Sequence, residues 1–119
     1  MFMTIDDFFE DREESRNLFE AIARQIAAIG EVTIRVSKSQ IAFKRKRNIA
    51  IVWMPGQYLK SNAAPLVLTL SFPKPDPSSR WKEIIQIGPQ RFTHHLELYE
   101  ASDIDGQVAG WLRVAWDAA

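Results

Sequence analysis

Apolar residues near the two ends of the chain recur at intervals of three and four, the spacing of one face of an α-helix. The first such segment spans residues 13–30 and has Leu18, Phe19, Ile22, Ile26 and Ile29 at these positions. The second follows the capping pair Ser102 and Asp105, and its positions are Val108, Trp111, Leu112, Ala115 and Trp116. Thr4 and Asp7 have capping-box spacing and predict a short helical turn before the first segment. The pattern therefore predicts an amphipathic helix near each end.

Between these helices the apolar period changes to two, which is typical of strands with one buried face. The alternating segments are 32–36, 41–44, 66–72 and 94–99. Segment 49–54 is apolar on both sides and predicts a central strand, with Trp53 on the core side. Residues 45–48 form an expected hairpin turn, and residues 81–87 fit either a helical turn or a short strand.

This order of elements predicts one α+β domain over residues 1–119, with two layers. An N-terminal helix, an antiparallel sheet of five or six strands and a C-terminal helix would place both helices on one face of the sheet. The opposite face would display Thr33, Arg35, Lys44, Thr69, Ser71, His95, Glu97 and Tyr99, with Ala50 and Val52 in its middle. A mostly polar, open face of this kind is the expected place of a binding site.

Composition removes several function classes. The 119 residues include no cysteine, which excludes disulfides, thiolate zinc sites and a cysteine nucleophile. No apolar run approaches the ~20 residues of a membrane span, and the first residues lack a signal-peptide pattern. The sequence predicts a cytoplasmic protein with no membrane association.

The formal net charge is zero, yet the charges are segregated along the chain. Residues 1–31 hold eight acids and three bases, residues 32–75 hold eight bases and no acid, and residues 76–119 hold seven acids and four bases. If folding keeps the middle third on one side, the protein has a basic face that attracts phosphates or an acidic partner.

The densest basic cluster is Lys44, Arg45, Lys46 and Arg47, with Lys38 nearby. A hairpin tip can present such groups to nucleic acid or to an acidic protein. The plainer interpretation is a solvated turn that protects the sheet from aggregation. Trp53 and Tyr58 follow the cluster and could stack on bases, although Trp53 fits the core better.

His94 and His95 are neighbours on an expected strand, so their side chains point to opposite faces and cannot hold one ion together. His94 shares its side with Leu96 and Leu98 and is predicted to be a hydrogen-bonded core histidine. His95 shares the polar face with Glu97 and Tyr99, where it is a candidate base or part of a hydrogen-bond network. The residues of a predicted pocket on this face are Arg35, Trp53, His95, Glu97 and Tyr99.

No catalytic residue, metal site or cofactor follows from these residues, since no phosphate-binding loop, nucleophile elbow or zinc motif is present. An acidic stretch, residues 6–14, leaves a cation-binding role open.

Three stretches together resemble a bacterial family, domain of unknown function 5655. They are residues 36–45, residues 80–82 and residues 91–98, followed by the tryptophan-bearing last helix. Members occur alone or as C-terminal parts of larger proteins, some of which look like restriction or defence nucleases. The resemblance implies an accessory or binding role more than a free-standing enzyme.

The leading hypothesis is therefore a small binding module for an anionic partner, with nucleic acid as its first form and an acidic protein as its second. One alternative is a small-ligand protein or enzyme with a pocket on the open sheet face. Another is a cation-binding or structural dimer protein. The sequence leaves open whether the chain is a monomer or a homodimer.

Overall fold

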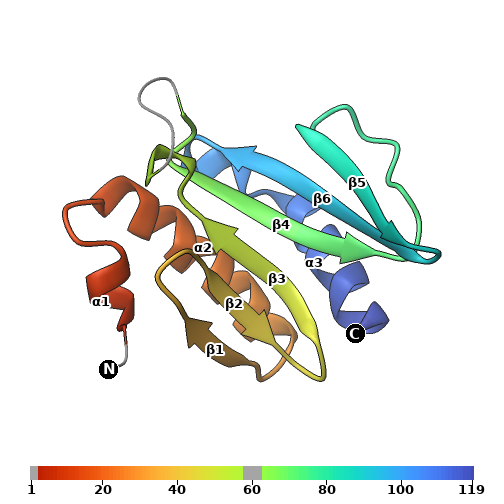
Figure 1. Ribbon diagram of the computed structural model, residues 1–119, viewed down its shortest axis with the longest axis horizontal. Coiled ribbons are helices and arrows are strands. Elements are labelled where there is room, and N and C mark those ends of the chain that lie inside the picture. Colours follow the sequence, from red (N-terminus) through yellow and green to blue (C-terminus); the bar gives the residue numbers. More distant parts are fainter. Residues whose placement is uncertain (1–2, 58–62) are drawn as a thin grey trace.

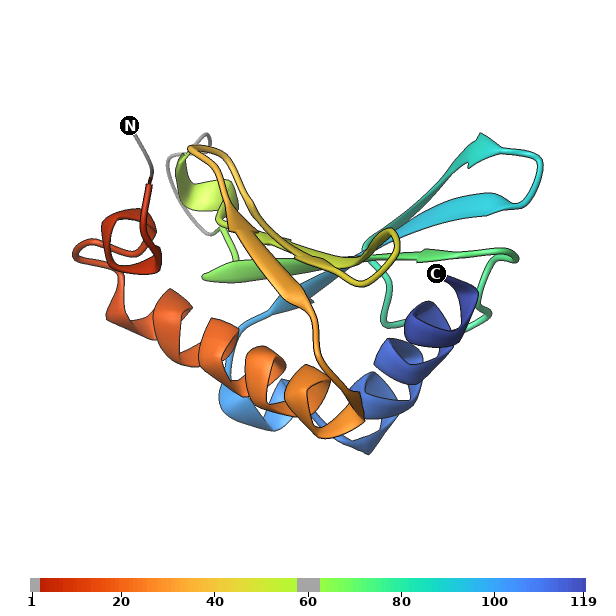
Figure 2. The same cartoon turned by 90° about the horizontal axis from the view of Figure 1, so that it is seen from below.

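The computed structural model describes residues 3–57 and 63–119, which form two layers (Figures 1 and 2). The helical elements are α1 (Ile5–Phe8), α2 (Glu13–Ile29), η1 (Pro55–Gln57), η2 (Ala101–Asp103) and α3 (Gly106–Ala118). The strands are β1 (Thr33–Val36), β2 (Ile41–Lys44), β3 (Asn48–Trp53), β4 (Leu66–Phe72), β5 (Glu83–Gly88) and β6 (Arg91–Leu98). Helices α2 and α3 lie on the same face of the sheet, as the sequence predicts. Tyr58 falls outside the described residues.

The six strands form one antiparallel sheet in the order β1-β2-β3-β4-β6-β5. Residues 45–47 make the predicted tight turn between β2 and β3, closed by the Arg45 N–H bond to the Arg47 carbonyl. The ambiguous segment 81–87 is mostly strand, since β5 begins at Glu83 and pairs with β6. Short connections therefore bring strands that are neighbours in sequence together, with the single exception that β6 lies between β4 and β5.

Helix ends follow the capping chemistry of the sequence. Thr4 and Asp7 form the predicted capping box at α1, and Gly30 is the C-cap of α2. The cap of α3 is Asp105, whose carboxylate accepts from the Val108 N–H at 3.1 Å. The prediction that Ser102 opens this helix is wrong, because Ser102 lies in η2 and α3 begins four residues later, at Gly106.

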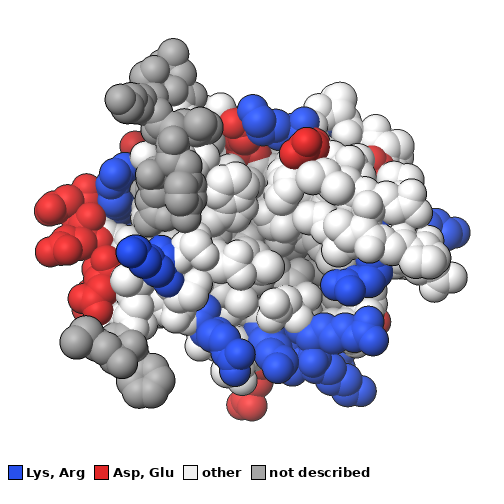
Figure 3. Space-filling model, viewed as in Figure 1, with Lys and Arg blue, Asp and Glu red and all other residues white. Residues whose placement is uncertain are grey.

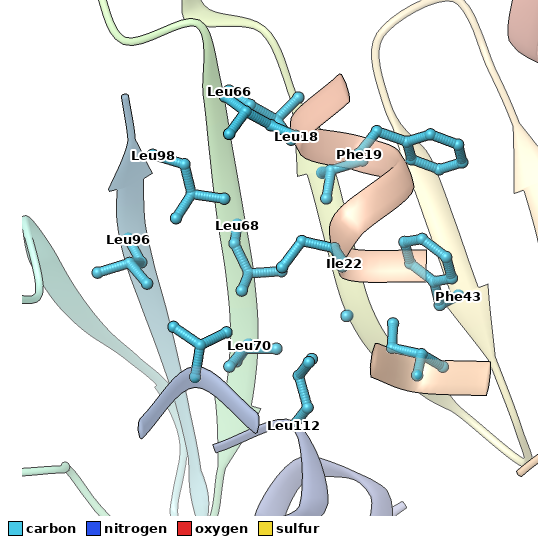
Figure 4. Packing of buried hydrophobic residues seen from close by; sticks show 14 of the residues in the cluster. Leu18, Phe19, Ile22, Phe43, Leu66, Leu68, Leu70, Leu96, Leu98 and Leu112 are labelled. Atoms are coloured by element: carbon cyan, nitrogen blue, oxygen red, sulfur yellow. The ribbon is translucent and has the colours of Figure 1, made fainter. Parts of the chain in front are cut away.

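The core lies between the helices and one face of the sheet (Figure 4). Its labelled side chains come from α2, α3 and strands β2, β4 and β6: Leu18, Phe19, Ile22, Phe43, Leu66, Leu68, Leu70, Leu96, Leu98 and Leu112. The tryptophan Trp111 in α3 is also buried, with its ring centroid 4.2 Å from that of Trp81. This packing holds the sheet from one side, and no described helix covers the opposite face.

In strand β3, the residues that the sequence analysis placed on the open face lie on the helix side instead. Ala50 pairs with Leu70 and Val52 with Leu68, so both small residues face the helices and are buried. Ile51 and Trp53 consequently face the open side and are half-buried. The sequence could not set this phase because the strand is apolar on both sides, and only the pairing with β4 decides it.

Among the residues that the structure describes, no helix is both long and apolar enough to cross a bilayer.

Candidate functional site

The β5–β6 hairpin rises away from the helical layer (Figure 2), and the face of the sheet that the helices leave open is hollowed beside it. A trough of about 150 Å³ runs along this face between β3 and the hairpin. Its lining residues are Asn48, Ile49, Ala50, Ile51, Thr69, Leu70, Ser71, Ile87, Arg91 and Thr93. The trough thus has a mixed apolar and polar surface with one guanidinium.

A larger hollow of about 370 Å³ lies at the end of the sheet where the β2–β3 and β5–β6 turns approach the end of α3. We call it the terminal hollow; its lining is Arg47, Asn48, Ser71, Phe72, Pro73, Gln90, Arg91, Ala115, Ala118 and Ala119. It shares Asn48, Ser71 and Arg91 with the trough, so the two are adjacent. Arg47 and Arg91, from two separate turns, therefore meet at one concave surface.

We use the term basic edge for Lys44, Lys46 and Arg47 of the β2–β3 hairpin together with Arg91. No carboxylate lies within 4.0 Å of these four cationic groups in the described part of the chain. Lys and Arg side chains gather along the lower border of the open face, whereas acidic side chains gather at its left end near α1 (Figure 3). The acidic N-terminal stretch therefore does not neutralise the basic edge.

Arg45 differs from its neighbours, since it holds the last helix in place. Its guanidinium donates to the Trp116 carbonyl at 3.1 Å and lies 4.8 Å from the centroid of the Trp116 ring. This cation–π contact and hydrogen bond fix the end of α3 against the hairpin. Of the predicted cluster, Arg45 thus has a structural partner and the other three bases remain available.

A hydrogen-bonded chain crosses the open face from β3 to β6. The Trp53 Nε1–H donates to Thr69 Oγ1 at 3.0 Å, and Thr69 Oγ1 lies 2.7 Å from Nδ1 of His95. The Trp53 and His95 rings meet edge to face, with centroids 6.0 Å apart. The structure therefore brings two of the predicted pocket residues together through a threonine that the sequence analysis did not single out.

Burial lowers the pKa of His95 below its ordinary value, an effect that the carboxylate of Glu83 opposes. Because Thr69 already accepts from Trp53, its hydroxyl is free to donate to Nδ1 of a neutral His95. This assignment leaves the His95 proton on Nε2. The open face at neutral pH thus carries an uncharged imidazole.

The remaining predicted pocket residues take no part in the hydrogen-bonded chain from Trp53 to His95. Glu97 pairs with Lys82 at 3.5 Å and does not contact His95, and Tyr99 is exposed just after β6. Arg35 shares a row across the sheet with His95 but lies four strands away, roughly 19 Å at the usual strand spacing. Lys38 is exposed in the β1–β2 turn. Among the described residues, none of these four forms a hydrogen bond with His95.

His94 is fully buried, as predicted. Its Nδ1 lies 2.9 Å from the Phe92 carbonyl, and its Nε2 accepts the Asp76 N–H at 3.0 Å. These contacts require a neutral ring with the proton on Nδ1, and burial correspondingly lowers the pKa of His94. His94 is thus a structural residue that fastens the 73–79 loop to β6.

Within residues 3–57 and 63–119, no three histidine or acidic side chains are placed to hold a metal ion. Two of the acidic residues at the N-terminus are engaged otherwise: Asp6 pairs with Arg16, and Asp7 closes the capping box.

The comparison with protein families decides the relationship that the sequence only suggested. The sequence model of the family described as "Domain of unknown function (DUF5655)" matches residues 5–119. The chain belongs to the DUF5655 family. The match covers both layers of the DUF5655 fold, including the trough and the basic edge. No curated protein and no solved structure matches the chain.

Sequence reasoning placed Thr69 and Ser71 of this DUF5655 chain on the open face but not among the pocket residues, and it gave no site role to Gln90 and Arg91 of the two hollows. The dipeptide Gly88-Pro89 marks a turn, which was the one local signal that Arg91 begins a strand beside a hairpin tip. That this turn lies beside the β2–β3 turn depends on the placing of β6 next to β4, which no local pattern indicates.

Proposed function

We propose that this chain is a cytoplasmic binding module for single-stranded nucleic acid, with phosphates held at the basic edge and bases lying along the open face. The observation that carries the proposal is the meeting of Arg47 and Arg91 at the terminal hollow, where no carboxylate of the described residues lies within 4.0 Å of either guanidinium. Two guanidiniums from different turns form a site that a phosphate can bridge. Asn48, Ser71 and Gln90 add neutral hydrogen-bonding groups to the same surface.

The charge distribution supports an extended anion. Lys44 and Lys46 continue the positive charge beyond the terminal hollow along the hairpin. On this face the largest group of acidic side chains lies at the other end, near α1 (Figure 3). Each base that neutralises a phosphate releases a counterion, which makes such binding favourable and dependent on salt. Because the contacts are to phosphate, we expect little sequence preference.

A single strand fits this face better than a duplex does. The trough adjoins the terminal hollow, and Ile51 on its floor and the nearby half-buried Trp53 offer apolar surface to unpaired bases. Bases in a duplex are already stacked and would not reach that surface.

The test is fluorescence anisotropy with labelled single-stranded and duplex DNA and RNA. The first variant combines Lys44→Gln, Lys46→Gln and Arg47→Gln and retains Arg45, so that α3 keeps its contact. We expect the wild type to bind single strands and this variant to bind them about tenfold more weakly or worse at low salt.

A matched control separates the basic edge from total charge. Arg12→Gln, Arg24→Gln and Arg113→Gln remove the same three charges from exposed positions in or beside the helices. This control is expected to bind like the wild type. Equal weakening in both triple variants would reduce the effect to net charge and contradict the proposal, as would a wild type that binds no nucleic acid at low salt.

A further inference from the structure

Strand β5 is an uncovered edge of the sheet. The strand order leaves its outer side without a neighbour, and its first five residues are exposed. Three of them are isoleucines: Ile84 is 36%, Ile85 41% and Ile87 55% exposed. Exposed apolar residues on a strand whose backbone groups are also unpaired mark a surface that pairs with another strand.

The protections that usually guard such an edge are weak here. Its only charged residue is Glu83 at the start, and Pro89 follows only after the strand ends. The hairpin rises away from the helices, so the helical layer does not cover β5 (Figure 2). The opposite edge is different, because β1 has only four residues and carries Arg35 at its centre.

We infer that β5 pairs antiparallel with β5 of a second copy of this chain, forming a two-fold symmetric homodimer. With Gln86 at the two-fold axis, Ile85 of each copy lies opposite Ile87 of the other on the open side of the sheet, so apolar side chains meet apolar side chains. Ile85 and Ile87 are thus complementary to each other across the two copies.

The charges fit the same arrangement. Antiparallel pairing puts the two Glu83 carboxylates at opposite ends of the seam, where they do not repel each other. Each Glu83 then lies near the far end of the other β5, and there Gly88 pairs with Arg91 of β6. Glu83 and Arg91 are on the open side of the sheet, since Glu83 pairs with His95 and Arg91 lines the trough. Each copy therefore offers a guanidinium to the other copy's carboxylate.

This pairing would join two six-stranded sheets into one and keep both open faces on the same side, because the symmetry axis is perpendicular to the sheet. The inference shares one residue with the proposed function, since Arg91 belongs to the basic edge and also lies beside the partner copy's Glu83. Dimer formation is measured without nucleic acid, so the two proposals can fail separately.

The first test is sedimentation velocity over a range of concentrations, with wild type and Ile85→Lys. We expect the wild-type mass to rise with concentration from 13.7 kDa toward twice that value, and Ile85→Lys to remain a monomer. Ile34→Lys is the matched control, since Ile34 lies on the other edge strand and is 40% exposed. It should associate like the wild type.

Circular dichroism of each variant checks that it is folded. A wild type that stays monomeric at its highest soluble concentration would overturn the inference, and so would an Ile85→Lys variant that is folded and still dimeric.

A second test leaves the isoleucines of the proposed β5–β5 interface unchanged. The chain has no cysteine, so Gln86→Cys introduces the only thiol, near the centre of the pairing. Mild oxidation should link two copies of Gln86→Cys far faster than two copies of Ile34→Cys. Equal rates for the two variants would contradict pairing at β5.

Discussion

His94 provides the sharpest test of how the sheet and its loops are fastened, because its neighbour His95 offers a matched comparison. His94→Ala removes two part-buried hydrogen bonds, those with the Phe92 carbonyl and the Asp76 N–H. Leaving a buried polar group unpaired costs about 1–3 kcal/mol. The substitution also empties the space beside Phe72, whose ring centroid is 4.5 Å from that of His94. We expect the free energy of unfolding to fall by about 3–5 kcal/mol in total.

His95→Ala should be much milder. The ring is half-buried on the open face, and Thr69 keeps the hydrogen bond from Trp53 when it loses the imidazole. The expected loss is about 1 kcal/mol.

Urea unfolding followed by tryptophan fluorescence at neutral pH measures both variants. With a slope of about 1–3 kcal/mol per molar urea, the midpoint of His94→Ala should lie roughly 2 M below that of the wild type. A His94→Ala protein within about 1 kcal/mol of His95→Ala would refute the assignment of His94 as a fastening residue.

The same residue predicts how stability depends on pH. Burial lowers the pKa of folded His94, whereas in the unfolded chain it titrates near its ordinary value of 6.5. As pH falls below 6.5 the unfolded chain binds more protons than the folded one, so the free energy of unfolding falls with pH. His94→Phe should remove most of this decline between pH 7 and 5. His95, whose pKa burial also lowers, leaves a decline of the same sign. An undiminished decline in His94→Phe would contradict the argument.

Two further predictions concern α3 and its contacts. A Cβ at Gly30 would lie 2.7 Å from the Trp116 ring, so Gly30→Ala should lower the free energy of unfolding by about 1–3 kcal/mol. A Cβ at Gly110 has no atom within 4 Å, so Gly110→Ala should raise the free energy of unfolding by about 0.5–1 kcal/mol. Urea unfolding measures both variants, and the opposite order of stability would contradict the packing. Asp105→Ala should cost about 1–2 kcal/mol near neutral pH, since it removes the cap of α3. The hydrogen bond from the Val108 N–H, followed by the contact with Arg80, lowers the pKa of Asp105. The stability lost in Asp105→Ala should therefore be present above pH 3.8 and vanish as pH falls through the folded-state pKa. A loss of stability that persists in strong acid would contradict this prediction.

Local patterns were sufficient for the helices, the β2–β3 turn and the opposite placement of His94 and His95, because each depends on residues close in sequence. They failed for β3, whose two apolar sides give no phase until β4 pairs with it. They also gave no sign that Arg45 would hold Trp116, since that contact joins residues far apart in the chain.

The same limit applies to the candidate site. The cluster of bases after residue 43 was visible as composition, but the second guanidinium of the terminal hollow comes from β6 and depends on strand order. Thr69 likewise gains its place between Trp53 and His95 only through register. Local sequence patterns therefore indicate only part of a site that is assembled from separate hairpins.

The most direct test of the proposed function is the slope of affinity for single-stranded DNA against salt. Four phosphate contacts at the basic edge predict a logarithmic slope of about −3, so binding should weaken about 50-fold between 50 and 200 mM salt. The variant with Lys44→Gln, Lys46→Gln and Arg47→Gln should show a slope of about −0.7 and weaken only about 3-fold over the same range. Equal slopes for the two proteins would contradict phosphate contact at the basic edge.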